Sequence, residues 1–368
     1  MKRIFGLDLL RASAISLVLI DHAAPLYEPR PQFLDVFGFL GVEMFFVLSG
    51  FLIGGILIAQ FEERFTPNDI WNFWIRRWFR TIPNYLLFLG IAMFISYKHG
   101  NLFNGVNDIW KYFLFLQNFS WKQSDFFTIS WTLAVEEWFY LLLPLLLFLR
   151  SRLTKESKQA TLLMTILSVV VAVTAVRCAY VYWLDPAWDN EVRRIVVLRL
   201  DALIYGVFGA YLVRYHEQFW HRERYTSFIV GTGLLVSCIY AYFELSLDHS
   251  YFGRTLLFSA VSLAIFCFLP LLNTWSSSSK SPIAETVTCV SLWSYSLYLS
   301  HREILGLVMS IRERFLHNSG VNTLLFSMLY IALSLILSWL CFNYFEKPTT
   351  RLREQFRLRK VQVEKPVA

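Results

Sequence analysis

The chain lacks any hydrophilic block long enough to fold alone. Its polar segments are loops of roughly 6 to 30 residues between apolar runs, which argues against separate soluble domains. Hydrophobic residues make up 56% and aromatic residues 18% of the 368 positions, well above the content of an ordinary soluble domain. This composition predicts one integral membrane domain.

Two other signals are missing. The five cysteines are scattered singly inside apolar runs without CxxC spacing, so we expect packing residues and neither disulfides nor a metal site. The first apolar run contains the internal pair Asp21-His22, and no small-residue cleavage site follows it. A secretory signal peptide therefore fits poorly, and we expect the spans themselves to act as the targeting signal.

Apolar runs of about 18 to 25 residues predict an all-α, polytopic membrane protein with about ten transmembrane helices. We expect a membrane domain over residues 1–348 and a basic cytoplasmic tail over residues 349–368. The aromatic segment 109–119 is too short to span and fits an interfacial or re-entrant piece. The predicted spans are residues 9–26, 33–60, 82–98, 128–149, 160–183, 194–213, 226–247, 252–272, 287–310 and 322–343.

Lys and Arg in the loops predict the orientation. With the N-terminus in the cytoplasm, the inner segments collect about 21 basic residues and the outer loops about 10. This bias predicts both termini inside and a multi-pass protein of the cytoplasmic (inner) membrane. The net charge of +7 then follows from topology, with lipid headgroups as expected partners and no nucleic acid.

Several ionisable residues fall inside the predicted spans. Each is costly in hydrocarbon, and the usual reason for one is a site facing the protein interior. These residues are Arg11, Asp21, His22, Glu43, Glu136, Glu137, Arg177, Arg199, Asp201 and His301.

Arg11 and His22 are eleven residues apart, which on a helix is about 20° past three full turns. They therefore share a face, roughly 16 Å apart along the axis. A cationic mouth leading to a deep imidazole suits an anionic molecule with a long arm, such as coenzyme A. The alternative is that Arg11 snorkels to the headgroups and His22 satisfies a backbone carbonyl.

A general base needs a partner that holds its tautomer and stabilises its charged form. Asp21 points about 100° away from His22 around the helix, a poor position for that role. We expect the carboxylate to come from another helix, from Glu43, Glu136 or Glu137. The alternative is that these buried glutamates only join helices together.

The stretch WIRRWFRTIPNY places Arg77 and Arg80 three residues apart, on one helical face just before a span. Two guanidinium groups so placed can grip phosphate oxygens. Taken alone they also fit positive-inside anchors. Beside Arg11 they predict a phosphate-binding mouth.

Taken together, these segments resemble the acyltransferase 3 family of multi-pass membrane acyltransferases, many of which O-acetylate bacterial surface glycans. The resemblance covers nearly the whole chain in sequential order. Its segments are Arg11 to His22, GVEMFFVLSGFLI from Gly41, RRWFRTIPNY from Arg76, SWTLAVEEWFYLLLP from Ser130, LRLDALIYG from Leu198, SYSLYLSH from Ser294 and YFEKP from Tyr344.

The resemblance implies a cytoplasmic acyl-CoA donor, with His22 essential and Arg11 its motif partner. Two positions depart from the common pattern: Glu43 stands where Asp is common, and Lys347 where Arg often precedes the proline. Some members append an extracytoplasmic SGNH-type domain. This chain ends about 25 residues after its last predicted span, so we expect it to meet its acceptor at the membrane domain or to use a separate acyl-relay partner.

The prediction is therefore a membrane O-acetyltransferase that uses acetyl-CoA as co-substrate. Its expected acceptor is a cell-surface glycan or lipid-linked precursor, such as lipopolysaccharide O-antigen or exopolysaccharide. His22 acts as general base or is itself acylated, and Arg11, Arg77 and Arg80 hold CoA phosphates. Weaker candidates for the substrate pocket, or for internal ion pairs, are Arg199, Asp201 and His301.

Two alternatives stay open. One is a polytopic transporter or exporter of a small metabolite, because intramembrane Arg, His and Glu also form proton relays; we detect no inverted-repeat similarity in its favour. The other is an acyltransferase for a longer group such as succinyl, which calls for an extra cation in the pocket.

Overall fold

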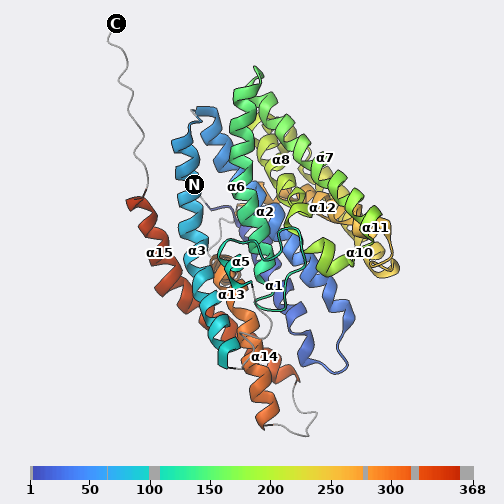
Figure 1. Cartoon of the computed structure of the whole chain (residues 1–368), viewed down its shortest axis with the longest axis vertical. Helices are drawn as coiled ribbons and strands as arrows, with labels where there is room; N and C mark the ends of the chain where they lie inside the picture. The colour runs from blue at the N-terminus through green and yellow to red at the C-terminus, as the bar shows by residue number, and fades with distance from the viewer. Residues whose placement is uncertain (1–2, 64, 99–107, 277–280, 316–322, 357–368) are drawn as a thin grey trace.

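The computed structural model describes residues 3–63, 65–98, 108–276, 281–315 and 323–356 (Figure 1). Over these ranges the chain forms helices and no strands. The protein is an all-α, multi-pass membrane protein, as predicted. The last twelve residues of the predicted tail lie outside the described residues, and α15 (Lys347–Arg351) runs across the predicted domain boundary at residue 348.

Each of the ten predicted spans overlaps a long helix. These helices are α1 (Phe5–His22), α2 (Asp35–Glu63), α3 (Pro67–Lys98), α6 (Ser130–Leu153), α7 (Lys158–Leu184), α8 (Asp201–Tyr215), α10 (Arg224–Glu244), α12 (Leu256–Thr274), α13 (Pro282–Phe315) and α14 (Thr323–Cys341).

Short helical elements connect the long helices. They are η1 (Ala24–Leu26), η2 (Gln32–Leu34), α5 (Ile109–Phe113), η3 (Trp188–Arg193), η4 (Val196–Leu198), α9 (Glu217–Arg222), α11 (Tyr251–Arg254), η5 (Phe342–Glu346) and η6 (Leu352–Gln355). The segment 109–119 contains only the five-residue α5 and turns, so it does not span, as predicted.

Eight segments of the described chain are long and apolar enough to cross a membrane by length and composition. Two of the ten long helices, α8 and α13, are not among them. The first has only 15 residues, and the second carries polar residues such as Ser294, Ser296 and His301 that the bundle buries. Polar residues of a membrane helix can face the interior of the bundle, so a test of length and composition can miss a helix that the bundle encloses.

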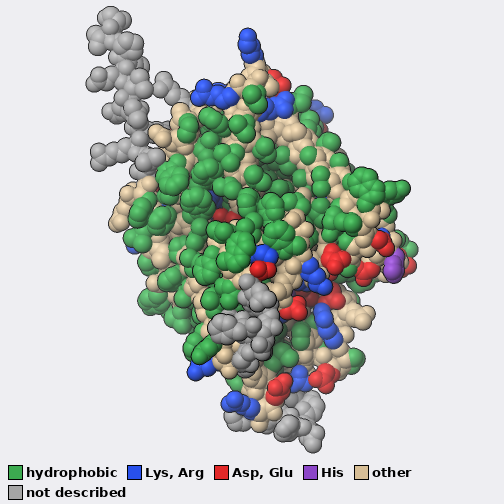
Figure 2. Space-filling view, in the orientation of Figure 1, with side chains coloured by type: hydrophobic (Ala, Val, Ile, Leu, Met, Phe, Trp, Pro, Cys, Tyr) green, Lys and Arg blue, Asp and Glu red, His purple; other side chains and the backbone are tan. Residues whose placement is uncertain are grey.

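The bundle has a basic end, where α1 begins. Lys158 Nζ donates to the carbonyl oxygen of Glu62 at 2.7 Å, and the Gly6 amide donates to the carbonyl oxygen of Trp275 at 3.1 Å. The first contact joins the end of α2 to the start of α7, and the second joins the start of α1 to the end of α12. Figure 2 shows a broad hydrophobic belt, with Lys and Arg side chains at the end where α6 ends. The opposite end, where α1 ends, shows charges of both signs.

Glycine residues allow α2 and α8 to cross at very short range. A Cβ atom on Gly206 of α8 would lie 2.0 Å from the Val47 carbonyl oxygen of α2, and one on Gly50 would lie 1.8 Å from the Leu203 carbonyl oxygen. Small residues let helix backbones approach this closely in membranes. The crossing fixes α2 against the residues that precede α8, including Arg199.

Gly206→Ala should therefore destabilise the bundle, because α2 and α8 must move apart to admit the methyl group. Overpacking of this kind costs about 1–3 kcal/mol. The measurement is thermal unfolding of the detergent-purified protein. Gly55→Ala is the matched control on α2, since a Cβ atom there meets nothing within 4 Å. Equal midpoints for the two variants would contradict the packing argument.

Candidate active site

His22, the last residue of α1, forms a pair with His301 of α13. The His22 Nδ1 and His301 Nε2 atoms are 2.8 Å apart, and the two rings stack with centroids separated by 4.8 Å. His301 is fully buried. The structure thus brings together two histidines that are 279 positions apart.

The hydrogen-bond network assigns the protons of this pair when both rings are neutral. His301 Nδ1 lies 3.1 Å from the Leu297 carbonyl oxygen, which can only accept, so Nδ1 carries the proton. His301 Nε2 then accepts from the Nδ1–H of His22. The Nε2 atom of His22 is left with a free lone pair, as a general base requires.

The prediction that Glu43, Glu136 or Glu137 orients His22 is wrong, because the Nδ1 atom of His22 pairs with His301. Glu43 forms an ion pair with Arg199 and accepts from Ser262 Oγ at 3.0 Å, so its charge is already satisfied. The carboxylate that does approach His22 is Asp21 of the same helix, whose Oδ2 lies 3.9 Å from His22 Nε2. That separation is too long for a hydrogen bond but favours a positive charge on the ring.

The other two predicted glutamates lie elsewhere in the bundle. Glu136 accepts from Ser49 Oγ at 2.9 Å and from the Tyr140 hydroxyl at 3.2 Å. Glu137 accepts from Thr81 Oγ1 at 2.6 Å. Helix direction could not be used to choose among three glutamates on two other helices, so their partners were beyond the reach of sequence reasoning.

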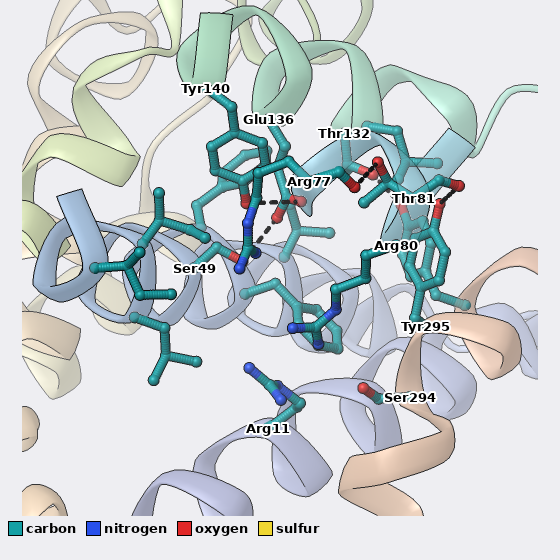
Figure 3. Close-up of a pocket in the computed structure, with 18 residues that line it drawn as sticks. Arg11, Ser49, Arg77, Arg80, Thr81, Thr132, Glu136, Tyr140, Ser294 and Tyr295 are labelled. Carbon is teal, nitrogen blue, oxygen red and sulfur yellow. Dashed lines mark hydrogen bonds between the residues drawn. The ribbon is translucent and has the colours of Figure 1, made fainter. Parts of the chain in front are cut away.

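The three predicted phosphate-binding arginines line one cavity of about 260 Å³, here called the arginine cavity (Figure 3). Arg11 enters it from α1, and Arg77 and Arg80 enter it from α3. Its remaining wall is largely apolar and aromatic. The polar side chains of that wall include Ser49, Thr81, Thr132, Glu136, Tyr140, Ser294 and Tyr295.

None of these three arginines forms an ion pair with any residue that the structure describes. Arg77 lies with its guanidinium carbon 6.0 Å from the centre of the Tyr140 ring, and Glu136 lines the same cavity without pairing. Unpaired guanidinium groups in a membrane bundle are costly unless a ligand supplies negative charge. The cavity therefore has the character of an anion site.

A second cavity of about 510 Å³, the basic vestibule, adjoins the arginine cavity at the basic end. Arg11, Arg80 and Leu52 line both. The vestibule is bounded on its other side by Arg3 and by residues of η5, α15 and η6. Anions that enter from the basic end thus meet a continuous basic path.

A third cavity of about 550 Å³, the histidine cavity, lies at the opposite end and contains Asp21 and His22. It shares Val42 and Tyr298 with the arginine cavity, so these two side chains form a septum between them. The Tyr298 hydroxyl accepts from Thr132 Oγ1 at 2.8 Å and donates to the Ile129 carbonyl oxygen at 3.2 Å. Three cavities therefore follow one another through the bundle.

The histidine cavity has a polar wall that sequence reasoning missed. Asp189 pairs with Arg193 at 2.5 Å and with Arg194, and the Arg193 guanidinium carbon lies 5.3 Å from the centre of the Trp131 ring. Burial opposes ionisation, but the charges of Arg193 and Arg194 lower the pKa of the Asp189 carboxyl group. The clustered charges of WDNEVRR beside a tryptophan were the available signal.

Arg199 and Asp201 serve internal ion pairs, as one of the two sequence alternatives held. Arg199 pairs with Glu43, and Arg177 grips Asp201 through two hydrogen bonds of 3.0 and 2.8 Å. Ser259 joins the second pair through Arg177 at 2.7 Å. These pairs connect α2, α7, α8 and α12 around the site.

Comparison with known families identifies the family of the chain. The family model described as an acyltransferase domain matches residues 4–343. The chain belongs to the acyltransferase 3 family. The match includes every predicted site residue from Arg11 to His301, whereas Arg3 and the vestibule residues from Glu346 onward lie outside it.

This acyltransferase 3 chain is similar to several larger proteins. It is 26% identical over 364 residues to peptidoglycan O-acetyltransferase OatA of Listeria monocytogenes, covering 94% of this chain and 56% of that protein. A putative O-acetyltransferase of Staphylococcus aureus is 25% identical, with coverages of 95% and 57%. A putative peptidoglycan O-acetyltransferase of Bacillus subtilis is 26% identical, with coverages of 93% and 54%.

The chain thus spans a little over half the length of these curated relatives. No solved structure matches it. The substrates that the relatives' names give are those of longer proteins.

Arg199→Met should destabilise the fold, because it leaves Glu43 buried without its counter-ion. Breaking a buried pair from one side costs about 3–5 kcal/mol. Thermal unfolding in detergent measures this loss. The double variant Glu43→Gln with Arg199→Met should recover a large part of it, since no lone charge then remains. A single variant as stable as wild type would show that the pair contributes nothing to folding.

Proposed function

We propose that this chain is an integral membrane O-acetyltransferase that moves an acetyl group from acetyl-CoA to a hydroxyl group of a cell-envelope glycan. The observation that carries the proposal is the His22–His301 pair. The free Nε2 atom of His22 lies beside the histidine cavity, which the septum separates from three arginines that form no ion pair with a described residue. The names of the relatives support a peptidoglycan-type acceptor.

In this proposal the donor enters from the basic end, which faces the cytoplasm where acyl-CoA is made. Arg11 and Arg80 hold the diphosphate at the junction of the vestibule and the arginine cavity. Arg11 and His22 are roughly 16 Å apart along α1, a length comparable to an extended pantetheine arm. The thioester then lies at the septum, within reach of the histidine cavity.

The acceptor hydroxyl enters from the histidine cavity. His22 Nε2 takes the hydroxyl proton as the oxygen attacks the thioester carbonyl carbon. Collapse of the tetrahedral intermediate breaks the carbon–sulfur bond, and the imidazolium returns its proton to the leaving thiolate. During the step Asp21, 3.9 Å from Nε2, stabilises the positive ring.

His22→Ala should lower acetyl transfer by about 10²–10⁴-fold, the usual contribution of a positioned general base. The measurement is transfer of radiolabelled acetyl from acetyl-CoA to purified glycan fragments by the full chain in detergent or vesicles. His221→Ala is the matched control, because His221 is half exposed on α9. Full activity in a folded His22→Ala protein would disprove the assignment, and wild type that never consumes acetyl-CoA would disprove the donor.

His301 is a positioning residue in this scheme, since it touches His22 and fixes its tautomer. His301→Leu removes the acceptor for His22 Nδ1–H and should lower kcat about 10–100-fold, the range expected for one lost buried hydrogen bond. KM for acetyl-CoA should stay unchanged. His301→Gln offers a carbonyl oxygen to the same proton and should recover part of kcat. If the Leu and Gln variants have equal kcat, the hydrogen bond does not orient the base.

A further inference from the structure

We infer that the C-terminal arm, made of η5, α15 and η6, binds the 3′-phosphate of the donor coenzyme. The arm supplies Lys347, Arg351 and Arg353 to the basic vestibule. The inference rests on the proposed function and adds to it a binding surface for the nucleotide end of the donor.

The arm is held against the bundle by specific contacts. Thr350 Oγ1 donates to the Glu346 carbonyl oxygen at 2.7 Å and lies 3.5 Å from that of Phe79 on α3. The Phe356 ring stacks on the Phe79 ring with centroids 4.9 Å apart. These contacts hold the arm against α3, where it lines the vestibule.

A buried carboxylate anchors the start of the arm. Glu346 Oε2 accepts from Ser296 Oγ at 2.6 Å and from Asn84 Nδ2 at 3.4 Å. These partners come from α13 and α3, so the glutamate of the YFEKP motif joins the arm to both helices. The basic residues that follow are thereby aimed at the vestibule.

The vestibule has an excess of positive charge. Six cationic side chains line it, against the two carboxylates Asp8 and Glu346. Asp8 is already engaged by Arg3 through hydrogen bonds of 2.9 and 2.6 Å and by Ser291 at 2.8 Å. Within the described part of the chain neither Lys347 nor Arg351 forms an ion pair, whereas Arg353 Nε lies 3.3 Å from Glu354 Oε1 on the arm itself. The free charge therefore gathers on the arm and at the junction with the arginine cavity.

The order of these cations along the path matches the order of charges on the coenzyme. Arg11 and Arg80 line both cavities, and so lie closer to the thioester than the arm does. The diphosphate is joined directly to the pantetheine arm, whereas the 3′-phosphate is on the far side of the ribose. A diphosphate at Arg11 and Arg80 consequently directs the 3′-phosphate toward Arg351 and Arg353, whose guanidinium groups suit bidentate phosphate contacts.

The test compares acetyl-CoA with 3′-dephospho-acetyl-CoA as donors for the full-length protein. Wild type should show a KM about tenfold higher for the dephospho donor, as loss of one charge-assisted contact predicts. The double variant Arg351→Gln with Arg353→Gln should raise KM for acetyl-CoA about tenfold and leave its kcat unchanged. Its KM for the dephospho donor should equal that of wild type.

Arg222→Gln is the matched control, because Arg222 is an exposed arginine of α9 outside the vestibule. It should change neither KM. If the double variant raises both KM values equally, the arm does not read the 3′-phosphate. If it changes neither, the arm serves lipid headgroups instead, and the inference fails. Wild type that uses neither donor would overturn the proposed function itself.

Discussion

Every ionisable side chain buried in this bundle needs a partner, because hydrocarbon offers neither water nor counter-ions. The chain meets this constraint in two ways. Glu43 with Arg199, and Asp201 with Arg177, satisfy each other inside the protein. Arg11, Arg77 and Arg80 instead line one cavity, which Glu136 also lines, and within the described ranges none of the three forms an ion pair.

The position of the cavity arginines depends on the buried ion pairs. The glycine crossing of α2 and α8 brings Glu43 next to Arg199, and this neutral core can then be packed tightly around α1. Because α1 is held in place, its two ends reach different cavities. The ion pairs join the helices of the scaffold, and the proposed function assigns the remaining arginines to an anionic donor.

The sequence predicted what depends on a single helix. The 3.6-residue period was enough to place Arg11 and His22 along one axis, and the spacing of Arg77 and Arg80 was enough to place them on one face; the structure puts all three arginines in one cavity. Apolar runs located ten helices of the described chain for the same reason, since hydropathy is a local property of each segment, although α8 and α13 are not long and apolar enough to count as spans by themselves.

Partners from distant parts of the chain were not predictable. His301 was a weak pocket candidate, yet it is the residue that His22 contacts, because α13 returns to pack against α1. Glu43 was expected at the histidine and lies instead with Arg199. A one-dimensional pattern gives the direction of a side chain around its own helix, but the neighbour it meets depends on how the helices cross.

The septum of Val42 and Tyr298 has an electrical consequence. Cavities on both sides of it extend toward opposite ends of the bundle. A voltage across the membrane therefore falls mainly across this septum. Moving one elementary charge through 100 mV costs about 2.3 kcal/mol. An acetyl group carries no charge and passes such a barrier without electrical work, whereas a coenzyme with its phosphates does not. In the proposed reaction, the partition formed by Val42 and Tyr298 would let the neutral acetyl group pass while the charged coenzyme, and the ions on each side of the membrane, stay where they are.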